Sequence, residues 1–197
     1  MQSTLLGYEF VRNCMDTLGY GHMVFDDSHF KADLQYDDAI ALLKRLRDVG
    51  TAEGRIFGVK LTNTFPVAIT RHELPGTEMY MSGKPLFFLS MNVAKKLSEA
   101  FDGKLQISYS GGADAHNIAD IVSAGIWPVT VATTLLKPGG YERLVQMANL
   151  LTGQAGQAFT GVNVGKLNAL LESASGDRHY ARLDPKAQHR KNKRELP

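Results

Sequence analysis

Apolar residues along the chain alternate between a helical spacing and short continuous runs. A spacing of three to four residues predicts amphipathic helices, and short apolar runs between glycines or acidic residues predict buried strands. The helical spacing covers 4–18, 37–49, 85–101, 114–124, 140–151 and 164–173. The strand-like runs lie at 22–25, 55–63, 104–110 and 127–133. This alternation predicts an α/β fold, in which parallel strands are joined by right-handed helical crossovers.

Four strand–helix units fit either a small open sheet or half of a TIM (β/α)8 barrel. A complete barrel needs about 250 residues, and the chain has 197. The one long aperiodic stretch, 64–84, contains several prolines and glycines and is typical of a lid or binding loop. We expect residues 1–176 to form the C-terminal half of a barrel and residues 177–197 to be a basic tail or linker.

Composition and charge exclude several classes of protein. Hydrophobic residues make up 44% of the chain, enough for a core, and no apolar run is long enough to span a membrane. The net charge of +2 is uneven, because residues 178–197 hold seven Lys or Arg against two acidic residues. The remaining body is mildly acidic, which argues against a nucleic-acid-binding surface. The single cysteine, Cys14, fits a reducing compartment, so we expect a cytoplasmic protein.

Two consecutive strand ends carry residues suited to binding a phosphate. Gly111 and Gly112 follow the strand at 104–110, and Thr133 and Thr134 lie at the end of the strand at 127–133. Glycines let backbone N–H groups approach an anion at the start of a helix, and barrels build their phosphate site after two such strands. The pair of turns therefore predicts phosphate binding, although either turn alone is also compatible with a plain connection.

Other polar residues precede these turns. Asn63 and Thr64 end the strand at 55–63, where an amide and a hydroxyl would face a polar heterocycle. Ser82 and Gly83 close the long loop, either approaching a ligand or capping the next helix. Lys60 lies nearer the middle of its strand, so it either points at a cofactor or forms an ion pair inside the barrel.

Other kinds of chemistry find little support. The acidic stretch 26–33 contains carboxylates and a histidine, but its spacing matches no zinc or calcium motif, and we expect a polar loop without a metal. No G-x-S-x-G nucleophile elbow is present, so hydrolysis is not supported. The sequence assigns no catalytic residue.

Four segments in chain order carry a resemblance to a known family: KLTNT at 60–64, YMSGK at 80–84, SYSGGAD at 108–114 and ATTLLKPG at 132–139. The chain resembles the flavin barrel of the dihydropyrimidine and dihydroorotate dehydrogenases, and most closely that of the selenate reductase subunit, over the C-terminal half of the barrel. The resemblance implies FMN as cofactor. It places the flavin phosphate and the rest of the cofactor along eight residues: Asn63, Thr64, Ser82, Gly83, Gly111, Gly112, Thr133 and Thr134.

The resemblance also implies a function and partners. The chain would be part of a flavin-dependent oxidoreductase that transfers hydride or electrons, whose intact relatives carry iron–sulfur and pyridine-nucleotide modules. With one cysteine, this segment would bind no cluster itself. We expect open sheet edges and an apolar inner face, covered by a second copy or by a separate N-terminal half-barrel. The alternatives are a non-catalytic scaffold subunit and an enzyme acting on a phosphorylated small molecule without flavin.

Overall fold

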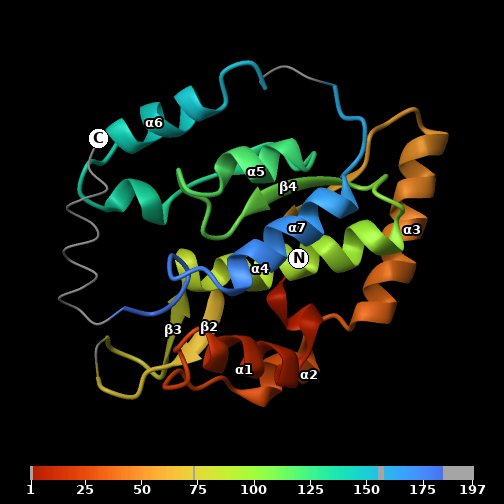
Figure 1. The fold of residues 1–197 in the computed structure, drawn as a ribbon. Helices are drawn as coiled ribbons and strands as arrows, with labels where there is room; N and C mark the ends of the chain where they lie inside the picture. The colour runs from red at the N-terminus through yellow and green to blue at the C-terminus, as the bar shows by residue number, and fades with distance from the viewer. Residues whose placement is uncertain (1, 73, 155–157, 184–197) are drawn as a thin grey trace.

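The computed structural model describes residues 2–72, 74–154 and 158–183. Helical elements come first, three strands follow, and helices and strands then alternate between residues 78 and 136 (Figure 1). The helical elements are η1 (Ser3–Leu6), α1 (Tyr8–Thr17), α2 (Asp27–Ala32), α3 (Tyr36–Ala52), α4 (Lys84–Ala100), α5 (Ile118–Ser123), η2 (Thr133–Leu136), α6 (Glu142–Leu150) and α7 (Val164–Ser175). The strands are β1 (Gly58–Leu61), β2 (Phe65–Ala68), β3 (Glu78–Met81), β4 (Gln106–Ser110) and β5 (Val129–Thr130).

The central sheet is parallel, which confirms the α/β fold expected from the sequence. In the described residues it has three strands in the order β1–β4–β5. Lys60 of β1 lies opposite Ser108, and Ser110 of β4 lies opposite Thr130. Three parallel strands fall well short of the eight that close a barrel, so the sheet is a partial barrel.

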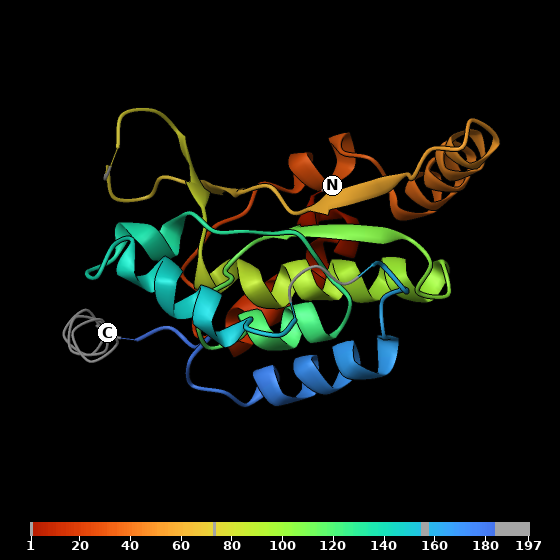
Figure 2. The same ribbon diagram turned by 90° about the horizontal axis from the view of Figure 1, so that it is seen from above.

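Helices cover one face of this sheet. Figure 2 shows α4 and α5 against the sheet, with α7 packed on their far side. The helix α4 lies between the sheet and α7, and most of its apolar side chains are buried, including Leu86, Phe87 and Leu97. On the sheet itself, Leu61 and Tyr109 point toward this core and are fully buried. The core is therefore the space between the sheet and the helices of one face.

The opposite face of the sheet is polar, contrary to the apolar inner face expected from the sequence. Lys60 and Thr130 are exposed there, and Ser108 and Ser110 are half-buried. The expectation was wrong because only every second residue of each strand is apolar, and those residues all face the helices. In a closed barrel this polar face would line the interior.

The segment 64–84 is a β-hairpin followed by a turn, where the sequence predicted an irregular loop. β2 and β3 pair antiparallel, with Phe65 opposite Met81 and Ala68 opposite Glu78. Phe65, Val67 and Met81 are buried, so the hairpin has one apolar face. Pro66 does not prevent pairing because the hairpin is a separate two-stranded sheet, in which both strands are edges.

The N-terminal region differs from prediction in three places. Gly7, with φ of +82°, separates η1 from α1, where one continuous helix was expected. Residues 22–25 form no strand, and a single backbone hydrogen bond from Ala68 to the carbonyl of Val24 joins them to β2. The stretch 26–33 contains α2 instead of a loop, because the Asp26 side chain accepts a hydrogen bond from the N–H of Ser28 and caps the helix.

The segment Asp177–Arg182, which we call the C-terminal strap, packs against the body of the protein. Within it, Tyr180 is 2% exposed and His179 is 8% exposed. Its last residue, Arg182, donates a backbone hydrogen bond to Leu18 at 2.8 Å. The sequence placed this strap in the basic tail, but it contributes side chains to the core. The rest of that tail, 184–197, lies outside the described residues.

The longest helices, α3 and α4, have 17 residues each. In the part of the chain that the structure describes, none of the helices combines the length and the apolar character needed to cross a membrane.

Candidate functional site

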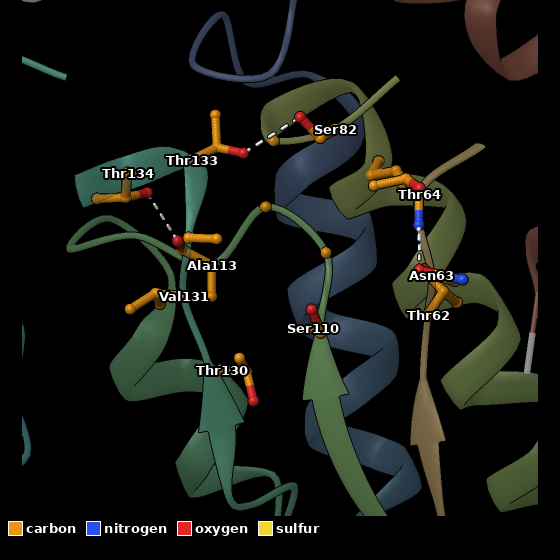
Figure 3. Close-up of a pocket in the computed structure, with 15 residues that line it drawn as sticks. Thr62, Asn63, Thr64, Ser82, Ser110, Ala113, Thr130, Val131, Thr133 and Thr134 are labelled. Atoms are coloured by element: carbon orange, nitrogen blue, oxygen red, sulfur yellow. Dashed lines mark hydrogen bonds between the residues drawn. The ribbon is translucent and has the colours of Figure 1, made fainter. Parts of the chain in front are cut away.

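A small cavity lies at the carboxyl ends of the three parallel strands (Figure 3). The strands β1, β4 and β5 run in the same direction, so the loops that follow them meet at one edge of the sheet. The cavity is lined by all eight residues predicted from the sequence: Asn63, Thr64, Ser82, Gly83, Gly111, Gly112, Thr133 and Thr134. The structure thus brings together residues that lie up to 71 positions apart in the chain.

The lining also includes residues that the sequence reasoning did not single out. Thr62, Ser110 and Thr130 line the cavity too, and each lies at or beside the end of a central strand. Thr62 is buried, and its hydroxyl lies 2.6 Å from that of Ser90 on α4. The signal that could have found these residues is their position, because the carboxyl ends of the three parallel strands all lie at this edge of the sheet.

Two glycine loops form the floor of the cavity and touch each other. Gly112 has φ of +81° and Gly83 has φ of +72°, a backbone region that favours glycine. A Cβ atom on Gly112 would lie 2.6 Å from the carbonyl oxygen of Gly83, and one on Gly111 would lie 2.3 Å from the Ser90 hydroxyl. These glycines are therefore needed for the two loops to pack this closely, whatever ligand they bind.

The two threonines have different roles in the structure. The Thr134 hydroxyl is buried and donates to the carbonyl of Ala113 at 3.0 Å, which ties η2 to the loop after β4. The Thr133 hydroxyl is half-buried and donates to the Ser82 hydroxyl at 3.2 Å, at the rim of the cavity. Thr133 and Ser82 can therefore turn toward a ligand, whereas Thr134 holds the loop in place.

Backbone N–H groups around the cavity are available for an anion. Among the described residues, no hydrogen bond is made by the N–H groups of Gly112, Ala113, Thr133 or Thr134. Thr133 and Thr134 begin η2, where the first N–H groups of a helix have no partner within it. The residues that line the cavity carry no formal charge, so it offers neutral donors in a fixed arrangement.

The size of the cavity limits what it can enclose. Its volume is about 90 Å³, roughly three times the ~30 Å³ share of one water molecule. Pockets that enclose an entire cofactor or drug-sized ligand measure about 300–1,000 Å³. The cavity therefore suits a group of the size of a phosphate, and a larger ligand would extend beyond it over the open polar face of the sheet.

A buried pair of hydrogen-bonded side chains lies behind the loop after β4. Asp114 follows this loop directly, and its carboxylate accepts a hydrogen bond from His179 Nε2 at 2.8 Å. Burial raises the pKa of Asp114, but the hydrogen bond from His179, the N–H of His116 and the nearby charge of Lys84 outweigh it and lower the pKa below its usual value. The imidazole of His116 stacks on that of His179 and pairs with Asp177 at 2.6 Å. Sequence spacing gave no sign of this cluster, because its partners come from distant segments.

The remaining candidate residues lie elsewhere. Lys60 is exposed on the open face of the sheet and does not line the cavity. Carboxylates of the stretch 26–33 cap and stabilise α2, where Asp27 pairs with Lys31 one turn away. Cys14 is half-buried on α1, and burial raises the pKa of its thiol to about 11, so it is not a reactive thiolate.

Comparison with known proteins places the chain in a family. Residues 1–182 match the family described as Oxidoreductase YgfK, N-terminal TIM-barrel domain. The YgfK proteins of Escherichia coli strains K12 and O157:H7 are each 47% identical to the chain over 174 residues. This match covers 88% of the chain but only 17% of each relative, so the chain spans about a sixth of their length.

A solved structure is also similar. The crystal structure of ligand-free type DHODH from Eimeria tenella is 26% identical to the chain, with a TM-score of 0.40. The similarity covers 67% of the chain and 35% of that protein. The assignment of the chain to a family depends on the match over residues 1–182, which includes the C-terminal strap. The chain belongs to the family of the N-terminal TIM-barrel domain of the oxidoreductase YgfK.

Proposed function

We propose that this chain binds the phosphate group of FMN and forms part of a flavin-dependent oxidoreductase. The observation that carries the proposal is the cavity at the carboxyl ends of β1, β4 and β5, with its hydroxyls and with backbone N–H groups that make no hydrogen bond to the described residues. Its volume suits a phosphate. The family description as an oxidoreductase supports redox chemistry in general.

The residues present fit such a cofactor. The phosphate would be held by the loop Gly111–Gly112 and the start of η2 at Thr133, through backbone N–H groups and the Thr133 hydroxyl. Ser82 and Gly83 would line the chain of the cofactor, and Asn63 and Thr64 would face its ring or the substrate. FMN, when bound, supplies hydride and electron transfer, and the residues of this chain supply binding and orientation.

The whole protein would contain more than this segment. Because the chain spans 17% of the length of its E. coli relatives, we include in the proposal iron–sulfur and pyridine-nucleotide modules elsewhere in the intact protein. Its substrate would be an oxyanion such as selenate or a heterocycle such as a pyrimidine. Purified intact protein reduced by a pyridine nucleotide and offered each class in turn would separate the two.

The proposal includes a partner for the open sheet. Within the described residues, β1 and β5 each have a free edge, and unpaired strand edges favour further pairing. Either a second copy or an N-terminal half-barrel would complete the barrel. Multi-angle light scattering of the chain alone separates these outcomes: a dimer supports pairing of copies, and a monomer that binds a separately produced N-terminal half supports complementation. A monomer that does not bind it would contradict both.

Binding of FMN is tested against binding of riboflavin, which lacks the phosphate. Hydrogen bonds to a charged group are each worth about 1.5–3 kcal/mol, so a phosphate held by several donors should make FMN bind at least about 100-fold more tightly. Fluorescence titration of each flavin measures the two dissociation constants. Added inorganic phosphate should weaken FMN binding and leave riboflavin binding unchanged.

A matched pair of variants assigns the binding to the cavity. Thr133→Val removes one hydroxyl at nearly constant volume and should weaken FMN binding about tenfold. Thr51→Val makes the same change at an exposed position of α3 that does not line the cavity, and should have no effect. Equal affinity for FMN and riboflavin, or no binding of either by the completed barrel, would refute the proposed function. Stabilisation by sugar phosphates alone would instead favour an enzyme without flavin.

A further inference from the structure

We infer that His179 is a positioning residue that holds the two glycine loops of the cavity in register. The inference rests on the proposed function in one respect, that these loops bind an anion. The loops are Gly83 with its neighbours, before α4, and Gly111–Gly112, after β4. His179 does not line the cavity, and it contacts a residue beside each loop from behind: Lys84, next to Gly83, and Asp114, two residues after Gly112.

The first contact is with the loop after β4. His179 Nε2 lies 2.8 Å from Asp114 Oδ2, and the two side chains are 8% and 9% exposed. The other carboxylate oxygen, Oδ1, accepts from the N–H of His116 at 2.9 Å. The carboxylate is thus fixed at both oxygens, and only Ala113 separates Asp114 from the glycine loop.

The second contact is with the loop before α4. Lys84 directly follows Gly83, and its Nζ lies 3.5 Å from His179 Nδ1. An ammonium group can only donate, so Nδ1 is the acceptor and the imidazole proton lies on Nε2, where it donates to Asp114. In this tautomer one buried ring joins a residue of each loop.

The neighbouring residue, Tyr180, strengthens the same connection. Its ring stacks on Phe87 of α4, with centroids 4.4 Å apart. Asn117, which is 1% exposed, donates from Nδ2 to the Gly112 carbonyl at 3.1 Å and to the Tyr180 hydroxyl at 3.4 Å. The strap therefore contacts the loop after β4 through Asp114 and Asn117, and the start of α4 through Lys84 and Phe87.

The position of these loops matters because the cavity contains no charged side chain. Its affinity for an anion would come from neutral donors, whose hydrogen bonds weaken steeply when distance or angle is lost. Binding sites of this kind need their donors held to within about 0.5 Å by supporting residues. His179 supplies that support from outside the cavity.

Amide hydrogen exchange tests the positioning role without any ligand. The N–H of Asp114 is bonded to Asn117 Oδ1, and the N–H of Leu86 is bonded to the Gly83 carbonyl, so these two amides report on the two loops. His179→Ala should speed their exchange at least tenfold relative to the Tyr109 amide in the core. His179→Gln, which can donate to Asp114 and accept from Lys84, should restore both. The control Leu43→Ala, in the buried face of α3, should not change the ratio.

A titration with FMN connects the loops to binding. His179→Ala should raise the FMN dissociation constant at least tenfold, whereas His179→Gln and Leu43→Ala should stay within threefold of the wild type. If His179→Ala does not fold, Lys84→Met removes the contact of Lys84 with His179 Nδ1 and keeps the hydrogen bond from Nε2 to Asp114, so exchange should speed up more at Leu86 than at Asp114. If the wild type binds no FMN, the proposed function fails, and the exchange data still decide the role of His179. Unchanged exchange at both amides in His179→Ala, or at Leu86 in Lys84→Met, would overturn the inference.

Discussion

Tyr180 offers a sharp test of where the folded part of this chain ends. The sequence assigned residues from 177 onward to a basic tail, whereas in the structure Tyr180 is 2% exposed. Its ring stacks on Phe87 at an interplanar angle of 10° and meets His179 edge to face, with centroids 5.0 Å apart. Replacing Tyr180 with alanine would leave a cavity between the strap and α4.

The expected cost follows from these contacts. Truncating a buried aromatic side chain to alanine costs about 3–5 kcal/mol, of which the stacked pair supplies roughly 0.5–1.5 kcal/mol. With a urea m-value of about 2 kcal/mol/M, the unfolding midpoint should fall by roughly 1.5–2.5 M. Tyr180→Phe keeps the ring and loses only the long hydrogen bond from Asn117, so it should cost about 1 kcal/mol or less.

Urea unfolding followed by circular dichroism measures the stability of the wild type, Tyr180→Ala, Tyr180→Phe and the control variant. Tyr141→Ala is the matched control, because Tyr141 is 79% exposed and its loss should change stability by less than about 0.5 kcal/mol. The reasoning fails if Tyr180→Ala costs less than about 1 kcal/mol, or no more than Tyr141→Ala. The strap would then contribute nothing to the core, and the sequence-based boundary at residue 176 would stand.

Three further predictions concern Asp114, Cys14 and Gly112. Asp114→Asn should lower the free energy of unfolding by about 1.5–3 kcal/mol. Because folding lowers the pKa of Asp114 from 3.8, the stabilisation by its carboxylate is complete above pH 3.8 and is lost as the pH falls through the pKa of the folded state. The variant should therefore lose less stability than the wild type when urea unfolding is repeated in acid, and identical acid profiles would contradict this. Cys14, with a pKa of about 11, should react with iodoacetamide at pH 8 roughly 200-fold more slowly than a free thiol, and equal rates would refute its burial. Gly112→Ala should weaken FMN binding and destabilise the chain more than Gly76→Ala does. Gly76 is the control because its φ is also positive but an added Cβ would meet nothing within 4 Å. Equal losses of stability in the two variants would exclude the clash with Gly83.

The site was largely predictable from the sequence because its determinants are local. Gly111 and Gly112 follow a strand in which every second residue is apolar, and Thr133 follows the next strand, so topology alone brings them to the same edge of a parallel sheet. The helix α4 was predicted within one residue at each end, since its apolar spacing is long and regular. What the spacing could not show is that Gly83 would touch Gly112.

Other features were missed because they depend on distant or competing signals. Asp114 and His179 lie 65 residues apart, and no spacing rule connects them. The prolines and glycines of 64–84 concealed the alternation of Phe65, Val67 and Met81 that marks a hairpin face. The apolar run at 22–25 lacks a partner strand among the described residues, so it forms no strand despite its composition.

The polar face of the sheet changes how a completed barrel should be understood. An apolar inner face would itself favour closure, because each Å² removed from water contributes about 25 cal/mol. The observed face presents Lys60, Ser108, Ser110 and Thr130, and burying such groups is costly unless each finds a hydrogen-bond partner. The partner that closes this sheet must therefore bring polar groups or leave space for a polar ligand. A cofactor whose phosphate occupies the small cavity would lie over this same face. The polar residues of this face would therefore contact the ligand and would also be buried when the barrel closes.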